Sequence, residues 1–152
     1  MYEVPEACRV FERWVGAWVV ELDVLRHDAE PVRVRGTSVS RLIGHGRWLV
    51  TEYSTADRDF EGHGVMGFDP AKDRYVYTWV DTLRPFLAVG EGTWDASRTL
   101  MQITTTASYD GRPMHWREEN EWLGDDARAF RSIMIAPDGK EALAIVGVYR
   151  RG

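Results

Sequence analysis

One predicted strand carries side chains that could bind or act on a small molecule. Tyr75, Tyr77 and Trp79 alternate along it, and Asp81 ends it. Alternate residues of a strand point to one face, so the two phenols could donate hydrogen bonds to a ligand carbonyl. Burial would raise the pKa of Asp81 and suit this carboxyl to general acid or base catalysis. The alternative role for Asp81 is turn chemistry, because it directly precedes a loop that it could cap.

A carboxylate and a guanidinium form the second candidate pair. Propagating the strand pairing through the turn at 124–126 places Glu118 opposite Arg131 on the inner face. Arg131 could there hold a carboxylate or an enolate. The alternative is a structural ion pair at the rim, since an inward carboxylate is tolerated where it meets an inward guanidinium. If the protein is an enzyme, Asp81, Glu118 and Arg131 are the catalytic candidates.

Metal, nucleotide and thiol chemistry find no support in the sequence. The four histidines lie on separate segments without the close spacing of metal ligands, so no metal site is expected. The G-x-G-x-x-G pattern at 62–67 lies inside a predicted strand and opens no helix, so it does not predict a dinucleotide site. Cys8 is the single cysteine, which excludes an internal disulfide, and we expect it to be a small buried residue. No cofactor is expected.

The elements that would position these residues are one helix followed by ten strands. Apolar residues at helical spacing from Pro5 to Trp14 predict a short amphipathic helix that could plug one end of a barrel. Period-two alternation then predicts strands at 17–27, 32–43, 47–55, 60–69, 74–81, 86–94, 99–107, 113–122, 127–136 and 141–150. Hairpin-length turns join these strands, which argues against a parallel sheet. The predicted fold class is all-β: a closed, up-and-down antiparallel barrel of about ten strands, because closure removes exposed edges.

Glycines opposite large rings indicate which face is the lumen. With the turn at 70–73, Trp79 stands opposite Gly64, and Tyr77 opposite Gly90. This alternation of large and small side chains suits the interior of a small barrel. The predicted ligand-binding residues are Met66, Phe68, Tyr75, Tyr77, Trp79, Phe86, Ile103 and Trp116. Carried through the later turns, the alternation of inner and outer residues places 129, 131, 133 and 135 inside. Before residue 60 the facing stays open, and either Glu52 or Tyr53 could point inward.

Composition limits the partners. The 152-residue chain is the length of one domain, predicted to span 1–152, and its net charge of −5 argues against a nucleic-acid-binding surface. No run reaches the roughly 18 apolar residues of a membrane-spanning helix. Residues 1–13 contain no apolar segment of the signal-peptide kind. We therefore expect a cytoplasmic protein with neither nucleic-acid nor membrane partners, and a homodimer is left open.

Several short motifs together resemble a known family. They are Gly16-Ala17-Trp18, similar to the G-x-W of lipocalin-like (calycin) barrels, then Gly44-His45-Gly46-Arg47-Trp48-Leu49, Gly62-His63-Gly64, Gly67-Phe68-Asp69, Tyr75 with Trp79-Val80-Asp81, and Tyr149-Arg150. In this order, over about residues 11–150, they resemble the bacterial family of unknown function DUF1579. The resemblance implies a lipocalin-like barrel with an N-terminal helix, and it brings no activity with it. The nitrobindins, a neighbouring group, bind haem through a histidine near the C-terminal end of the barrel. Here the last histidine is His115, so a haem role would lack its ligand.

Three functions fit these observations. In the first, the barrel binds a small, largely apolar molecule in its lumen, because the inward residues are rich in aromatic side chains. In the second, it is a cofactor-independent cyclase, isomerase or hydro-lyase that acts on a small hydrophobic, natural-product-like substrate by fixing its shape in the same lumen. In the third, the lumen is filled by the protein's own large side chains, and the barrel serves protein contacts.

Overall fold

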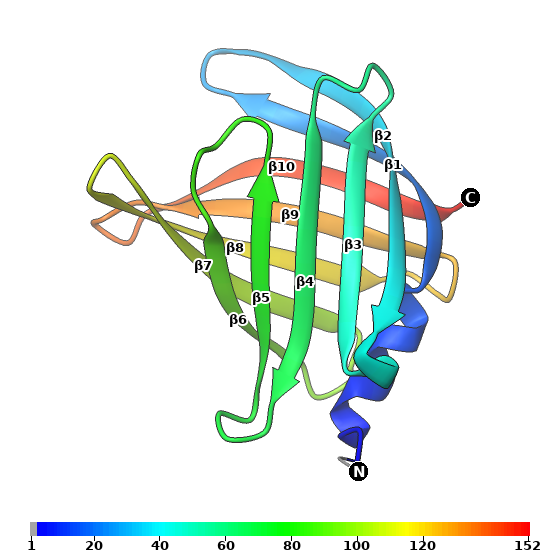
Figure 1. The fold of residues 1–152 in the computed structure, drawn as a ribbon. Coiled ribbons are helices and arrows are strands. Elements are labelled where there is room, and N and C mark those ends of the chain that lie inside the picture. Colours follow the sequence, from blue (N-terminus) through cyan, green and yellow to red (C-terminus); the bar gives the residue numbers. More distant parts are fainter. Residues whose placement is uncertain (1–2) are drawn as a thin grey trace.

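The computed structural model describes residues 3–152, which form a closed antiparallel β-barrel (Figure 1). Its elements are η1 (Glu6–Trp14), β1 (Gly16–Arg26), β2 (Ala29–Ile43), η2 (Gly44–Gly46), β3 (Trp48–Thr55), β4 (Glu61–Asp69), β5 (Arg74–Asp81), β6 (Ala88–Trp94), β7 (Leu100–Tyr109), β8 (Arg112–Trp122), β9 (Ala127–Ile135) and β10 (Glu141–Arg151). Each strand pairs with its neighbours in sequence, and β1 also pairs with β10, which closes the barrel. The predicted fold class is confirmed. Residues 1 and 2 of the predicted domain lie outside the described residues.

The hairpins turn at residues that accept a positive φ angle. Between β7 and β8, Asp110 and Gly111 have φ angles of 51° and 72°, and the residues that flank them, Tyr109 and Arg112, pair directly. Two left-handed residues in a two-residue loop give a turn whose twist matches that of the strands. Aspartate and glycine adopt this conformation more readily than most residues do. Such turns fix the register of the strands on either side.

The register predicted from β4 to β6 is confirmed. Gly64 pairs with Trp79 as expected. A Cβ atom on Gly62 would lie only 2.0 Å from Cζ2 of Trp79, so the indole ring occupies the space that a side chain at position 62 would need. On β3, where the sequence left two choices, Tyr53 is buried in the lumen and Glu52 is exposed.

The predicted facing of β9 is wrong. Glu118 pairs with Ser132, and Arg131 pairs with Glu119 instead. The β8–β9 loop spans 123–126, and pairing resumes after it one residue out of phase with the prediction. A shift of one residue turns every side chain of a strand to the opposite face. Arg131 therefore lies on the outer face, where its Nε is 3.2 Å from Oε1 of Glu119.

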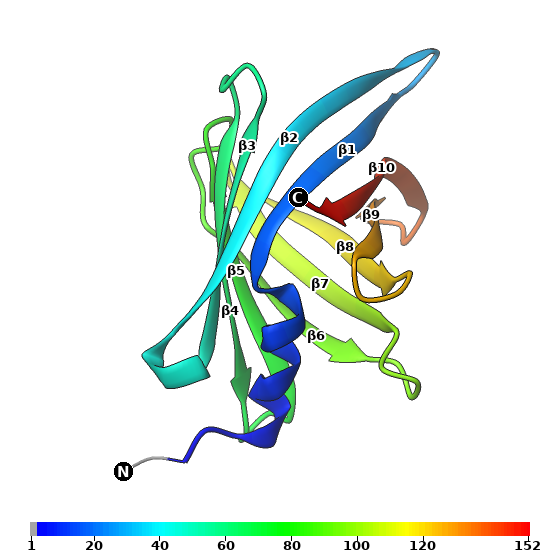
Figure 2. The same ribbon diagram turned by 90° about the vertical axis from the view of Figure 1, so that its right-hand side faces the viewer.

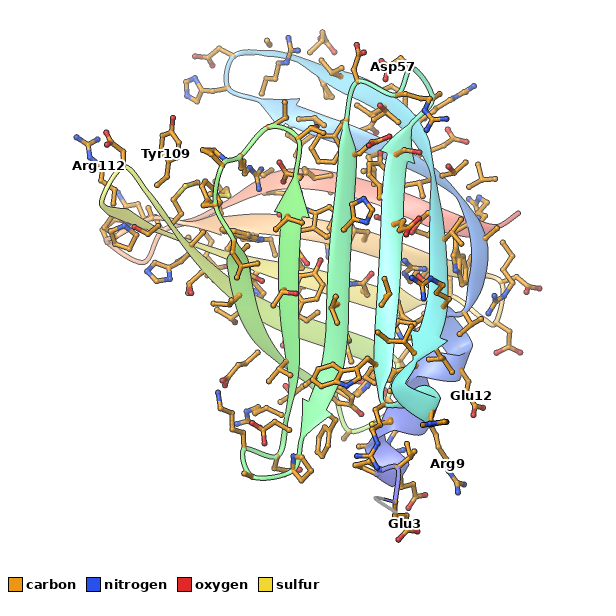
Figure 3. All side chains as sticks on the ribbon, in the orientation of Figure 1. Glu3, Arg9, Glu12, Asp57, Tyr109 and Arg112 are labelled. Carbon is orange, nitrogen blue, oxygen red and sulfur yellow. The ribbon has the colours of Figure 1, made fainter. Side chains whose placement is uncertain are left out.

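The helix η1 closes one end of the barrel (Figure 2). Cys8, Phe11 and Trp14 are buried, while Arg9 and Glu12 point away from the barrel (Figure 3). The predicted N-terminal helix is confirmed, but it is a 3₁₀ helix rather than the α-helix that the apolar spacing suggested. With three residues per turn, every third residue falls on one ridge, and this ridge supplies the buried side chains. Within residues 3–152, no helix has the length and hydropathy needed to cross a membrane.

Two side chains fasten η1 to the barrel. The Tyr75 hydroxyl donates to the carbonyl oxygen of Ala7 over 2.9 Å. At the other end of η1, Arg151 donates from Nη2 to the carbonyl oxygen of Arg13 and from Nη1 to that of Val15, both over 2.8 Å. This guanidinium holds the end of β10 against the start of β1. We call the β1–β10 pairing the seam.

Large rings fill the half of the barrel next to η1. Trp14 and Trp18 each meet Trp122 edge to face, with ring centroids 5.4 and 5.8 Å apart. Leu49 and Met101 complete this cluster with almost no exposed surface. This half matches the expectation of a barrel filled by its own side chains.

Candidate ligand-binding site

Two adjoining cavities lie in the lumen beyond the filled half. The inner chamber borders Trp14 and has a volume of about 70 Å³. The outer chamber, of about 160 Å³, extends toward the β5–β6 loop at 82–87. Both chambers are lined by Tyr53, Tyr77, Trp79, Glu118, Phe130 and Tyr149. An apolar cavity of about 150 Å³ holds a benzene molecule, so the outer chamber suits one ring-sized apolar group and the inner chamber a much smaller one.

Aromatic rings form the walls shared by the two chambers. Tyr77 and Trp79 lie nearly parallel, with centroids 6.5 Å apart and an interplanar angle of 25°. Phe130 meets Tyr149 edge to face at 5.9 Å. Burial raises the pKa of Tyr77 well above its usual value and that of Tyr149 to about 12. Both phenols therefore stay protonated at neutral pH and can donate hydrogen bonds to a ligand.

Asp81 lies at the mouth of the outer chamber and caps the β5–β6 loop. Its Oδ1 accepts the backbone N–H groups of Leu83 (2.9 Å) and Arg84 (3.0 Å). Its Oδ2 accepts the indole N–H of Trp79 (3.0 Å) and lies 3.9 Å from the Arg84 guanidinium. Both carboxylate oxygens are therefore occupied within the fold. The geometry agrees with turn chemistry, and Asp81 also fixes the position of the Trp79 ring.

Glu118 is the carboxyl group common to both chambers. Its Oε1 accepts the indole N–H of Trp116 over 3.1 Å. Protein atoms surround the group, although part of its surface faces the chambers. Burial raises the pKa of Glu118, and this effect outweighs the opposing influence of the Trp116 hydrogen bond and the Arg84 charge. Such a carboxyl can carry a proton in a pH range where exposed carboxyls have lost theirs.

The stability of the Glu118→Gln variant relative to that of the wild type is expected to increase as the pH rises. Because the pKa of Glu118 is raised in the fold, the folded state holds this proton more tightly than the unfolded state does. From the unfolded pKa, roughly 4.3, up through the folded pKa, the wild type therefore loses stability that the glutamine variant keeps. Urea unfolding of both proteins at pH 4 and pH 7 measures the difference.

Glu141→Gln provides a control of opposite sign. Arg117 donates two hydrogen bonds to Glu141, over 2.7 and 2.9 Å, and lowers its pKa. This variant is expected to match the wild type at low pH and to be less stable than it at neutral pH. Equal pH dependence of Glu118→Gln and the wild type would contradict the burial effect assigned to Glu118.

Arg128 is the cation of the inner chamber. Its Nε–H donates to Oδ1 of Asn120 over 3.2 Å, and only 3% of its surface is exposed. The guanidinium carbon lies 4.0 Å from the ring centroid of Tyr149, 4.6 Å from that of Trp14 and 4.8 Å from that of Trp18. Burial lowers the pKa of Arg128 to about 10, which leaves it protonated at neutral pH.

The structure gathers part of the predicted site. The predicted residues that line a chamber are Met66, Tyr77, Trp79, Asp81, Ile103, Trp116 and Glu118. Phe68 and Tyr75 pack against each other at 5.2 Å in the half next to η1. Phe86 packs against Tyr109 at 5.9 Å. Arg131, on the outer face, has no place in the lumen.

Sequence reasoning found Tyr77 and Glu118 but missed Arg128, Ser38 and Tyr149 among the polar residues of the inner chamber. Arg128 was missed because β9 was predicted one residue out of phase. Ser38 and Tyr149 were missed because no facing was predicted for β2 and β10. The closing Tyr149-Arg150 motif was visible in the sequence, but it carried no information on direction.

Cys8 does not line either chamber. Cys8, on η1, is buried, and its thiol donates a hydrogen bond to the carbonyl oxygen of Arg47 over 3.7 Å. Burial raises the pKa of this thiol, which lowers its reactivity. Residues 3–152 contain no group of three or more histidine, cysteine, aspartate or glutamate side chains arranged to hold a metal ion.

Known structures share this barrel. Rv2717c from M. tuberculosis superposes with a TM-score of 0.69 at 12% identity, over 99% of each chain. An S-type phycobiliprotein lyase, CPES from Guillardia theta, superposes with a TM-score of 0.61 at 18% identity, over 95% of this chain and 91% of its own. No curated protein matches the sequence. The model of the family described as "Protein of unknown function (DUF1579)" matches residues 5–151, and the chain belongs to that family.

Proposed function

We propose that the barrel binds a small, largely apolar molecule in the two chambers. The observation that carries this proposal is a cavity walled by Tyr77, Trp79, Phe130 and Tyr149 in the half of the lumen that the protein does not fill. Cavities with apolar and aromatic walls and a few convergent polar groups are the usual form of a small-molecule site.

The mouth of the outer chamber supports the same assignment. In the β5–β6 loop, Leu83 and Leu87 are 72% and 57% exposed, beside the chamber residue Arg84. Large apolar side chains exposed next to a cavity favour the capture of an apolar molecule.

The cytoplasmic location expected from the sequence and the homodimer that it left open both stay predictions.

Catalysis in the same lumen is the second candidate. Glu118, a buried carboxyl with a raised pKa that faces both chambers, favours it. With the Tyr77 hydroxyl as hydrogen-bond donor, it could serve a cofactor-independent cyclase, isomerase or hydro-lyase of a hydrophobic, natural-product-like substrate. The phycobiliprotein lyase has the same barrel fold, which is compatible with a lyase role as well as with binding. Arg131 takes no part in this scheme.

The test is to purify the protein natively and to identify by mass spectrometry any organic molecule that denaturation releases. The wild type is expected to release one apolar molecule per chain. Trp79→Ala removes the ring that walls both chambers and is expected to lower the amount at least about tenfold. Recovery of the molecule in two interconverting forms would favour catalysis over simple binding.

Trp48→Ala is the matched control. Trp48 lies on the outer face, 40% exposed, so its removal leaves the lumen unchanged. This variant is expected to retain the molecule at the wild-type level. Equal retention by Trp79→Ala, or an empty wild type that also shows no change in tryptophan fluorescence with octan-1-ol, would contradict the proposal.

A further inference from the structure

The inner chamber contains a buried cation without a counter-ion. Among residues 3–152, no carboxylate forms an ion pair with Arg128, and its Nη1 has no hydrogen-bond partner. Arg151 is the nearby group of the same sign, and its charge adds to the positive potential. An enclosed charge without a partner costs several kcal/mol of stability. A fold that retains such a group has a place where an anion would bind favourably.

The rings around Arg128 leave its edge available. Tyr149, Trp14 and Trp18 lie within 4.8 Å of the guanidinium carbon. Cation–π contacts are made over a ring face and use no N–H donor. A guanidinium has five N–H donors in a planar fork, and only the one on Nε reaches a side-chain acceptor, Asn120. The remaining donors are matched by an acceptor with two oxygens in one plane, which is the geometry of a carboxylate.

Two hydroxyl groups of the same chamber are also without partners. Ser38 Oγ and Tyr53 OH are buried and form no hydrogen bond with any residue from 3 to 152. Burial raises the pKa of Tyr53, so its hydroxyl keeps its proton and can donate. The chamber's volume of about 70 Å³ admits a carboxylate but no ring. The cation, the two hydroxyl groups and the small volume of the inner chamber all favour a carboxylate as the head group of the ligand.

We infer that the molecule bound in the lumen is a carboxylic acid, whose carboxylate lies in the inner chamber against Arg128 and whose apolar body lies in the outer chamber. This inference rests on the proposed function and specifies the class of its ligand. Entry is then carboxylate first, from the β5–β6 mouth past Tyr77 and Trp79. Glu118 lines both chambers on this path, and one of its oxygens is held by the indole N–H of Trp116.

Matched pairs of probes test the head group. We choose 3-phenylpropanoate with 3-phenylpropan-1-ol, and octanoate with octan-1-ol, because each pair differs only in the carboxylate. Titration calorimetry at neutral pH is expected to show the acid of each pair binding at least about tenfold more tightly, since hydrogen bonds to charged groups are the stronger ones. Equal affinities for acid and alcohol overturn the inference and leave the proposed function standing. Binding of neither member overturns both.

Variants of the two β9 arginines locate the preference. Arg128→Met is expected to abolish the preference for the acid while affinity for the alcohol changes less than about threefold. Arg131→Met, on the outer face of the same strand, is expected to leave both affinities unchanged. If Arg128→Met does not fold, Arg128→Lys decides, because it keeps the charge, loses the planar fork and is expected to weaken acid binding selectively. A preference unchanged in the Arg128 variant overturns the inference.

Discussion

Replacing Trp18 by alanine is expected to lower the free energy of unfolding by about 4 kcal/mol, the range for deleting a buried tryptophan. Trp18 is 1% exposed, meets Trp122 edge to face and donates from Nε1 to the carbonyl oxygen of Trp14 over 2.9 Å. Its ring also lies against the guanidinium groups of Arg128 and Arg151. The truncation therefore removes packing, a hydrogen bond and part of the support of η1 together. Urea unfolding followed by circular dichroism measures the change.

Trp48→Ala provides the comparison for this loss. Trp48 is 40% exposed on the outer face, where its ring covers Gly67. Its removal is expected to cost about 1 kcal/mol or less, because 40% of its surface is already in water and its loss on the outer face leaves no enclosed cavity. A similar cost for both variants would show that the rings next to η1 are not the stabilising core of the barrel.

Gly147→Ala is expected to open the seam. Gly147 pairs with Leu22 across it, and a Cβ atom at this position would lie 2.2 Å from the carbonyl oxygen of Glu21 and 2.9 Å from Cα of Leu22. Backbone atoms cannot rotate away as a side chain can, so β1 and β10 must separate. We expect a loss of about 3 kcal/mol, the upper range for overpacking. Hydrogen exchange is expected to accelerate at the amides of β1 and β10 before those of β4 and β5.

Gly152→Ala is the matched substitution. A Cβ atom on Gly152 would meet its nearest neighbours, in Ala17 and Val19, at 3.6 Å, which is ordinary contact. This variant is expected to unfold at the wild-type urea concentration. If Gly147→Ala behaves in the same way, the close approach of β10 to β1 does not limit stability.

The sequence was sufficient for the strands and for the facing of β4 to β8, because the tight turns at 70–73 and 110–111 carry recognisable residues and the longer loops at 82–87 and 95–99 keep the alternation in phase. Asp110 and Gly111 are an example, since their positive φ angles define a two-residue loop and hence the pairs around it. The glycines opposite Trp79 and Tyr77, Gly64 and Gly90, then identified the inner face. Inner and outer residues alternate along a strand, so the facing of the next strand is lost when the length of a loop is misjudged by one residue. The facing was left open before the loop at 56–60 and was predicted wrongly after the loop at 123–126.

The inner chamber could not be predicted for a related reason. On β9, one face carries Arg128 and Phe130, and the other carries Arg131 and Ile133. Each face holds one arginine and two large apolar residues, Met134 being the second on the inner face and Ile135 on the outer, so composition does not distinguish inside from outside. The ring contacts of Arg128 come from η1 and β1 near the start of the sequence and from β10 near its end. No local pattern reports such an assembly.

The seam also determines when the sheet edges become paired during synthesis on the ribosome. Val15 and Arg151, which hydrogen-bond beside it, are 136 positions apart in the chain. Until β10 has been synthesised, the nascent sheet has two unpaired edges, β1 and β9, and exposed edges template association with other chains. Contacts of such long sequence separation also form slowly. The nascent protein therefore presents edges open to association with other chains until the last strand of its barrel has paired.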